Sequence, residues 1–188
     1  MIYENDIQEC VKTFAQHGVI LYPTDTIWGL GCLADDEMAI EKIYNIKQRP
    51  AEKSFILLMT DVKQLSKYIA NPLPDLQSMI ANFETPTTII YDHAINLPSS
   101  LIAPDGSIAV RITKDPFCRS LIKRTKKPIV STSANLSGAP TPTIYSSVTT
   151  EIKNQVDYIV HHRQDDETIS VPSSIFKLMS SGNFLKIR

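Results

Sequence analysis

The chain has 188 residues, of which 43% are hydrophobic and 21% charged, and its formal net charge is −1. This composition is typical of a globular protein with a sizeable core, and the near-neutral charge excludes a global field that would draw the protein onto nucleic acid or a membrane. No run approaches the length of apolar residues that a membrane span needs, and the N-terminus does not resemble a signal peptide. The three cysteines, Cys10, Cys32 and Cys118, are far apart, which favours free thiols in a reducing cytoplasm over a zinc site.

The first elements along the chain are a helix and a short buried strand. Asp6 is a candidate N-cap, and apolar residues at helical spacing follow it until Gly18 ends the pattern. Residues 19–22 then form an apolar run that Pro23 interrupts. The next stretch, 24–26, brings three small polar side chains to the end of the strand, as a ligand-binding loop would.

A second extended piece, 30–33, leads into a helix that ends in cations. Asp35 or Asp36 caps this helix, and Pro50 bars its continuation. Its predicted core face is formed by Met38, Ala39, Ile43 and Ile46.

The cations Lys47 and Arg49 lie just before that proline. A guanidinium suits bidentate contact with carboxylate or phosphate, and an ammonium suits point contact with phosphate. A buried strand that opens onto hydroxyls, followed by a helix that ends in cations, therefore predicts a pocket for an anionic ligand. The alternative is that both cations are solvated at a helix terminus, which residue type alone favours.

The rest of the chain continues to alternate strands and helices. We predict strands at 54–59, 87–91, 108–113, 128–131 and 157–160, and a closing hairpin of 174–179 with 184–187. Helices are predicted from Asp61, at about 75–82, from Asp115-Pro116 and, more weakly, at 145–154, with a loop at 92–106. Because this alternation lacks the regularity of a Rossmann fold, we expect one α/β domain, residues 1–188, with a mixed, twisted sheet.

Two further segments can complete the pocket. Arg111 lies in an apolar strand pattern, where a charge is costly unless it pairs with a protein carboxylate or faces a ligand, and the residues leave both open. Residues 131–138 read Ser-Thr-Ser-Ala-Asn-Leu-Ser-Gly and follow a buried strand, so that they can hold phosphate or a nucleoside through outward N–H groups. An equally acceptable interpretation is a polar loop folded on its own Asx and Ser/Thr turns.

Several catalytic and metal-binding motifs are absent from the sequence. It contains no GxSxG, HExxH or Walker A pattern, and its four histidines lack metal-ligand spacing. We interpret His161 and His162 as part of a surface loop. Chemistry at the predicted pocket would therefore rely on positioning and charge neutralisation more than on a dedicated general base.

Four motifs occur in order along the chain: YPTDTIWGLG at 22–31, KQR at 47–49, IAVRI at 108–112 and STSANLSG at 131–138. With weaker matches at 172–176 and 186–188, they resemble the YrdC/Sua5 family of L-threonylcarbamoyladenylate synthases. The resemblance implies an α/β fold in which helices flank a twisted mixed sheet with a basic concave face. It also implies the synthesis of threonylcarbamoyl-AMP and pyrophosphate from L-threonine, bicarbonate and ATP, for N6-threonylcarbamoylation of adenosine 37 in tRNA.

The resemblance also assigns roles to individual residues. It implies that Lys47 and Arg49 are catalytic. ATP contacts are implied for Lys47, Arg49, Ser107, Ser133, Asn135, Thr141 and Arg188, and L-threonine contacts for Thr24, Lys53, Arg111, Ser131 and Ser174. No protein ligand to a metal is expected, because Mg²⁺ commonly binds through ATP phosphates and water. Implied partners are a downstream threonylcarbamoyl transferase complex and tRNA or double-stranded RNA.

The chain departs from the family pattern in two internal segments. Glu84-Thr85-Pro86-Thr87-Thr88 stands where the family commonly has Pro-Gly-Pro-x-Thr, and residues 51–55 look more like the YciO paralogues. Those paralogues lack the full set formed here by Lys47, Arg49, Ser133 and Asn135. We therefore favour an active synthase. The alternatives are a YciO-like paralogue and a non-catalytic RNA- or nucleotide-binding module.

Overall fold

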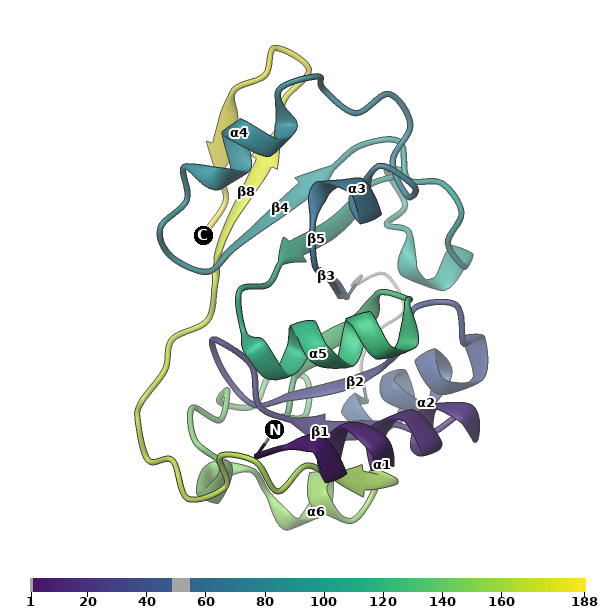
Figure 1. Cartoon of the computed structure of the whole chain (residues 1–188), viewed down its shortest axis with the longest axis vertical. Coiled ribbons are helices and arrows are strands. Elements are labelled where there is room, and N and C mark those ends of the chain that lie inside the picture. The colour runs from purple at the N-terminus through teal and green to yellow at the C-terminus, as the bar shows by residue number, and fades with distance from the viewer. Residues whose placement is uncertain (1, 49–54) are drawn as a thin grey trace.

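The computed structural model describes residues 2–48 and 55–188, and the strands within these ranges form one nine-stranded sheet (Figure 1). In chain order they are β1 Ile20–Tyr22, β2 Gly29–Leu33, β3 Ile56–Met59, β4 Thr87–Tyr91, β5 Ile108–Ile112, β6 Ile129–Ser133, β7 Tyr158–Ile159, β8 Ser174–Leu178 and β9 Phe184–Lys186. Across the sheet the order is β7-β1-β2-β6-β3-β5-β4-β8-β9. The pairs β1–β7, β3–β5 and β4–β8 are parallel and the others antiparallel, which confirms the predicted mixed sheet.

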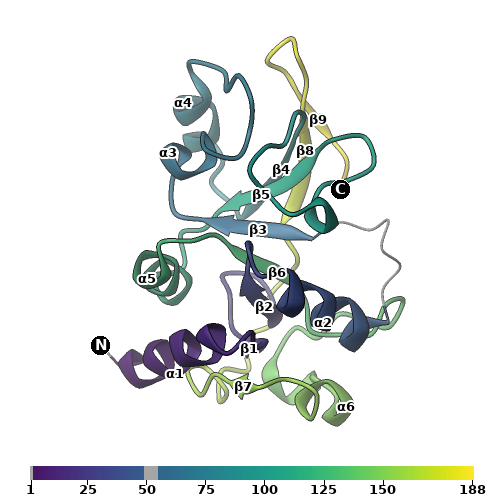
Figure 2. The ribbon, with the colours of Figure 1, turned by 90° about the vertical axis from the view of Figure 1, so that its right-hand side faces the viewer.

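Helices cover both faces of this sheet. They are α1 Glu4–Ala15, α2 Glu37–Lys47, α3 Val62–Leu65, α4 Leu76–Ala81, α5 Pro116–Thr125 and α6 Thr150–Lys153, with short 3-10 turns at Ser99–Leu101 and Tyr145–Ser147. Figure 2 shows α1 and α5 on one side of the central strands and α2 on the other. The predicted helix at 145–154 is thus a 3-10 turn followed by the single turn of α6.

Side chains of the central strands alternate between two hydrophobic cores. In β1, Ile20 and Tyr22 pack with α1 and α5, whereas Leu21 packs with the core that contains α2. Leu57 and Leu58 of β3 divide in the same way. This follows from the two-residue period of a strand. Because both faces are covered here, these strands read in the sequence as unbroken apolar runs.

The capping predictions hold for the two helices next to the site. The Asp36 carboxylate accepts the N–H of Ala39 at the start of α2, and the Asp115 carboxylate accepts the N–H of Cys118 at the start of α5. The predicted core face of α2 is wrong at one position, because Met38 is 66% exposed and Ile40 lies in the core instead.

The prediction that Asp6 caps the first helix is wrong. Helix α1 begins at Glu4, and the Asp6 carboxylate accepts hydrogen bonds from the Tyr158 hydroxyl at 2.6 Å and the His162 N–H at 2.9 Å. His161 also donates its N–H to Asp6, at 3.0 Å. This residue thus ties α1 to the segment that follows β7.

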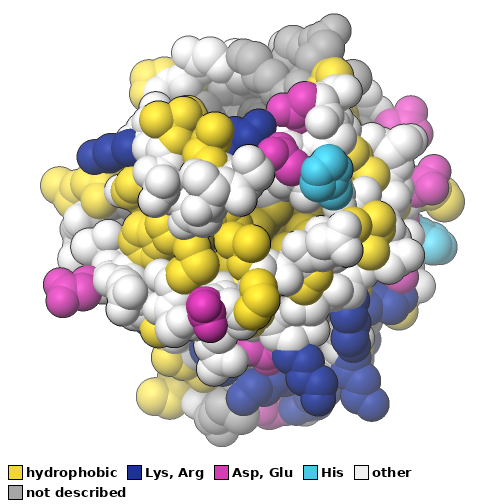
Figure 3. Space-filling view, turned by 90° about the horizontal axis from the view of Figure 1, so that it is seen from above, with side chains coloured by type: hydrophobic (Ala, Val, Ile, Leu, Met, Phe, Trp, Pro, Cys, Tyr) yellow, Lys and Arg dark blue, Asp and Glu magenta, His cyan; other side chains and the backbone are white. Residues whose placement is uncertain are grey.

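The cysteines, the lengths of the helices and the surface charges each bear on a prediction from the sequence. All three cysteines are buried free thiols. No helix within the described ranges is long and apolar enough to cross a membrane. Figure 3 shows Lys and Arg side chains gathered at one side of the face seen from above, beside neutral and hydrophobic surface. The basic concave face stays a prediction.

Candidate active site

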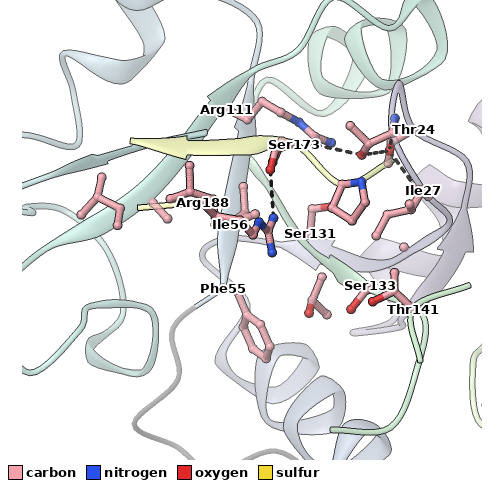
Figure 4. Close-up of a pocket in the computed structure, with 17 residues that line it drawn as sticks. Thr24, Ile27, Phe55, Ile56, Arg111, Ser131, Ser133, Thr141, Ser173 and Arg188 are labelled. Atoms are coloured by element: carbon pink, nitrogen blue, oxygen red, sulfur yellow. Dashed lines mark hydrogen bonds between the residues drawn. The ribbon is translucent and has the colours of Figure 1, made fainter. Parts of the chain in front are cut away.

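One face of the sheet is only partly covered by helices. Helix α5 packs over Tyr22, Leu58 and Ile129, and beyond it the same face carries small side chains. By strand register these are Gly29, Ala109, Ser131 and Ser133, and the larger Ile56 and Ile90 share this face with them. Because small side chains leave volume above the sheet, this face is hollowed into a cavity of about 310 Å³ (Figure 4).

The two glycines of β2 shape the floor of this cavity. A Cβ on Gly31 would lie 2.6 Å from Cε1 of Tyr22, so the tyrosine ring occupies the space of that missing side chain. A Cβ on Gly29 would lie 3.0 Å from the Thr132 carbonyl oxygen, and Gly29 itself lines the cavity. The Gly-Leu-Gly sequence therefore allows close ring packing at Gly31, and at Gly29 it allows close approach of the Thr132 backbone beside the cavity.

The turn after β1 forms one wall of the cavity. Thr24 donates its hydroxyl proton to the Ile27 carbonyl at 2.8 Å, so the 2.9 Å contact between the two threonine hydroxyls is donated by Thr26. Thr24 Oγ1 also accepts the Thr26 N–H at 3.0 Å. Since a hydroxyl has one proton and two lone pairs, the Thr24 hydroxyl is saturated by the turn itself.

Arg111 connects this turn to the sheet. Its Nη1 donates to Thr26 Oγ1 at 2.9 Å, and its Nη2 lies 3.2 Å from Asp25 Oδ1. The second contact is a charge pair without hydrogen-bond geometry, and Arg111 Nε has no hydrogen-bond partner among the described residues. The predicted pairing of Arg111 with a protein carboxylate is therefore confirmed. Arg111 also lines the cavity, and its contact with a ligand stays a prediction.

The opposite wall is the end of β6 and the loop beyond it. Strand β6 continues to Ser133, further than predicted, and so places Ser131 and Ser133 on the cavity face with Thr141 beside them. Lys47 is 1% exposed, and its Nζ donates to the carbonyl oxygens of Ser133 and Asn135, the latter at 2.6 Å. The interpretation of Lys47 as a solvated helix terminus is therefore wrong.

The loop after β6 is folded partly on itself, as the alternative interpretation predicted. The Asn135 amide nitrogen donates to the carbonyl oxygens of Leu136 at 3.0 Å and Ala139 at 2.7 Å, and Gly138 has a φ of 86°. The Asn135 side-chain oxygen is buried and lacks a hydrogen-bond partner among the described residues. The start of the segment thus lines the cavity, while its remainder forms local turns.

A third wall comes from the C-terminal hairpin and the segment before it. Arg188 Nη2 donates to the Ser173 carbonyl at 3.0 Å, and both residues line the cavity (Figure 4). The Ser173 hydroxyl lies 2.8 Å from that of Thr88, which joins the wall to β4.

Six of the ten predicted site residues that the structure describes line this one cavity. They are Thr24, Arg111, Ser131, Ser133, Thr141 and Arg188. Lys47, Ser107, Asn135 and Ser174 do not: Ser107 donates its hydroxyl to Asp105 at 2.6 Å, and Ser174 begins β8. Arg49, Pro50 and Lys53 lie outside the described residues.

The sequence analysis did not single out Asp25 as the partner of Arg111. A signal for it existed, because an arginine in a buried strand calls for a carboxylate and Asp25 directly follows another buried strand. It also missed Arg163, which binds the Thr24 carbonyl. Arg163 lies in a polar run at 161–167 that reads as solvent-exposed, so no local pattern indicates its position.

Two ionisable side chains of the core that contains α1 and α5 stay protonated near neutral pH. Burial raises the pKa of the Tyr22 phenol and of the Cys118 thiol well above their usual values. Neither group lines the cavity, so neither is a candidate nucleophile or base there.

The family model for Sua5, YciO and YrdC, described as "Telomere recombination", matches residues 12–188. The chain belongs to this family. The protein named Threonylcarbamoyl-AMP synthase from Pseudoalteromonas translucida is 34% identical over 184 residues, which cover 96% of this chain and 97% of that protein.

Solved structures of this family share the fold. The structure of P. abyssi Sua5 complexed with L-threonine superposes with a TM-score of 0.85 at 23% identity and covers 98% of this chain but 54% of its own. The structure of E. coli YciO superposes with a TM-score of 0.81 at 26% identity and covers 98% of this chain and 88% of its own. Since both superpose well, the fold does not distinguish a synthase from a YciO-like protein.

Proposed function

We propose that this chain is an L-threonylcarbamoyladenylate synthase, a nucleotidyltransferase that converts L-threonine, bicarbonate and ATP into threonylcarbamoyl-AMP, pyrophosphate and water. The observation that carries the proposal is a single cavity in which the buried Arg111 and the Thr24 turn face the hydroxyls of Ser131 and Ser133. Support comes from the name of the P. translucida relative and from the L-threonine complex of P. abyssi Sua5.

The amino-acid half of the proposed site is the turn with Arg111. The L-threonine carboxylate would bind the guanidinium, whose pairing with Asp25 leaves hydrogen-bonding capacity at Nε. The saturated hydroxyl of Thr24 offers no further hydrogen bond. In this proposal Thr24 therefore contacts the ligand through its methyl group and holds Thr26 against Arg111.

The nucleotide half is the β6 wall with Thr141 and Arg188. Lys47 acts in this proposal by fixing the carbonyl groups of the loop, beside which the ATP phosphates would lie. Arg49 remains the proposed phosphate ligand, and Lys53, Ser107, Asn135 and Ser174 remain proposed substrate contacts. The cations together would offset the charges of carbamate and triphosphate.

The chemistry itself needs little from the protein beyond alignment. The threonine amine attacks the carbon of bicarbonate, and loss of water gives the carbamate. A carbamate oxygen then attacks the α-phosphorus of ATP, and the bond from that phosphorus to the bridging oxygen breaks as pyrophosphate leaves with the electron pair. Positioning and charge neutralisation lower such a barrier without a dedicated base.

Mg²⁺ enters the proposal as a companion of ATP. The described residues contain no group of three or more His, Cys, Asp or Glu side chains that could hold a metal ion. The site in this proposal therefore suits a Mg²⁺ ion whose ligands are ATP phosphate oxygens and water. Such an ion would neutralise part of the charge of the triphosphate.

The cellular setting of the proposal follows the family. The product would pass to a threonylcarbamoyl transferase complex that modifies adenosine 37 of tRNA in the cytoplasm. Direct contact with tRNA or double-stranded RNA belongs to the same proposal.

Pyrophosphate release tests the proposed activity. Purified protein supplied with ATP, Mg²⁺, L-threonine and bicarbonate should release pyrophosphate, and omission of either threonine or bicarbonate should abolish the release. ATP binding without threonine-dependent release would contradict the proposal and favour the YciO-like alternative. Salt-sensitive RNA binding without any release would favour the non-catalytic module.

A further inference from the structure

Arg163 links three parts of the molecule that are distant in sequence. It lies in the segment between β7 and β8, and its backbone has a φ of 66°, which is uncommon for a residue other than glycine. Its Nη1 donates to the Thr24 carbonyl at 3.2 Å, and its Nη2 donates to Asp115 Oδ2 at 2.7 Å. The Asp115 side chain is 4% exposed and that of Arg163 is 26% exposed, so the carboxylate of this ion pair is shielded from water and the guanidinium is partly shielded.

The pair continues into the network around Arg111. The Asp115 N–H donates to Thr113 Oγ1 at 3.1 Å, and the Thr113 hydroxyl donates to Asp25 Oδ2 at 3.4 Å. Asp25 in turn pairs with Arg111. Two Arg–Asp pairs therefore hold the turn after β1. In the first, Arg163 is paired with Asp115 and binds the Thr24 carbonyl. In the second, Arg111 contacts the side chains of Asp25 and Thr26, and Thr113 connects the two pairs.

The Thr24 carbonyl is the group through which this second pair acts on the turn. The Thr24 hydroxyl is saturated within the turn, and its proton goes to Ile27. Thr26 lies in the same turn, contacts Thr24 Oγ1 through its N–H and its hydroxyl, and accepts a hydrogen bond from Arg111. Arg163 itself is not among the residues that line the cavity, so it would act through the turn and not through contact with ligand.

We propose that Arg163, anchored by Asp115, is a positioning residue for the L-threonine half of the site. It fixes the Thr24 carbonyl and so holds the turn in the conformation that presents Thr26 to Arg111. The inference about threonine rests on the proposed function, whereas the inference about the turn does not.

Enzyme kinetics test the role toward the substrate. Arg163→Ala should raise the KM for L-threonine by about 10- to 100-fold, because a small displacement of a positioning group is costly, and should change the KM for ATP much less. Arg163→Lys keeps the charge but lacks the two-pronged geometry, so it should fall between wild type and the alanine variant.

Arg124 provides a control on the same helix as Asp115. It is an arginine of α5 whose Nη2 donates to Glu4 Oε1 at 2.6 Å, and it makes no described contact with Thr24, Thr113 or Asp115. Arg124→Ala should leave the KM for L-threonine unchanged. An equal rise in that KM in both variants would mean that the effect is not specific to Arg163, and would overturn the proposal.

Hydrogen exchange tests the turn without any substrate. The Thr26 amide is protected by its bond to Thr24 Oγ1, so its exchange should accelerate in Arg163→Ala and remain at the wild-type rate in Arg124→Ala. Unchanged exchange in Arg163→Ala would overturn the proposal whatever the activity. Faster exchange in a protein without threonine-dependent pyrophosphate release would support the positioning of the turn and contradict the proposed function instead.

Discussion

The turn after β1, which lines the cavity, and the loop after β6 are held by different chemistry. The turn at 24–27 lies between two arginines, each paired with an aspartate. The loop after β6 is held by the Lys47 ammonium, which donates to two backbone carbonyls, and by the side-chain amide of Asn135. A planar guanidinium can support the protein with one edge and face a ligand with another, whereas an ammonium gives two of its three donors to the loop here.

This difference separates two cations that the motifs alone present as equals. Arg111 both supports a wall and lines the cavity, so its loss should remove a ligand contact directly. Lys47 does not line the cavity, so its loss should act through the position of the loop. Substitutions of single residues can test this division of roles, and replacement of Arg111 has the largest expected effect.

Replacement of Arg111 should have the largest effect on the amino-acid side. Arg111→Ala removes the proposed partner of the L-threonine carboxylate and also leaves the half-buried Asp25 without its cation. The lost carboxylate contact should cost about 2–5 kcal/mol in ligand binding. We expect threonine-dependent pyrophosphate release to fall at least about 30-fold, with the KM for L-threonine raised far more than that for ATP. Steady-state kinetics with each substrate varied in turn will measure this. A larger change in the KM for ATP would contradict the assignment.

Replacement of Lys47 should act on the nucleotide side. Lys47→Met keeps the aliphatic stem but removes the hydrogen bonds to the Ser133 and Asn135 carbonyls, each worth about 1.5–3 kcal/mol when the donor is charged. We expect weaker binding of a non-hydrolysable ATP analogue, measured by titration calorimetry, and L-threonine binding within about threefold of wild type. If binding of L-threonine weakens as much as binding of the ATP analogue, the assignment of Lys47 to the nucleotide side is contradicted.

The two floor glycines should separate stability from ligand binding. Gly31→Ala places a Cβ against the Tyr22 ring and the Val130 carbonyl, so it should lower the free energy of unfolding by about 1–3 kcal/mol. Gly29→Ala should cost less stability but narrow the cavity above it. Urea unfolding and threonine titration on both variants will check this. Equal losses of unfolding free energy in the two variants would show that the Tyr22 ring moves aside at little cost.

The smallest predicted effect concerns pH and the anchor at Asp6. Burial of Asp6 raises the pKa of its carboxyl, but the hydrogen bonds from Tyr158, His161 and His162 outweigh this, so the pKa lies below its usual 3.8. A carboxyl whose pKa is lower in the folded state stabilises the protein above the unfolded-state pKa, and this contribution is lost as the pH falls through the folded-state pKa. Wild type should therefore lose stability below about pH 4, and Asp6→Asn should show a flatter profile in urea unfolding.

The accuracy of the sequence analysis depended on how local each interaction is. The caps at Asp36 and Asp115 need partners only three residues away, and both were predicted correctly. Asp6 has the same residue type, yet its partner Tyr158 is 152 residues distant, and no local pattern reports such a contact.

The same limit applies to the site. The motifs identified six residues that meet in one cavity, because a buried arginine and a hydroxyl-rich strand end are recognisable patterns. They did not reveal that Lys47 points into the loop carbonyls, since that direction depends on how α2 packs against the end of β6. Arg163 could not be found at all, because its role depends on the path of the chain after β7.

A crystal structure of the protein with L-threonine tests the central claim most directly. The account predicts threonine in the cavity of about 310 Å³, with its carboxylate about 3 Å from the Arg111 guanidinium and its side chain beside the Thr24 methyl group. Threonine bound elsewhere, such as in the second cavity of about 440 Å³ near Phe83 and Ile112, with Arg111 still paired only to Asp25, would contradict the account.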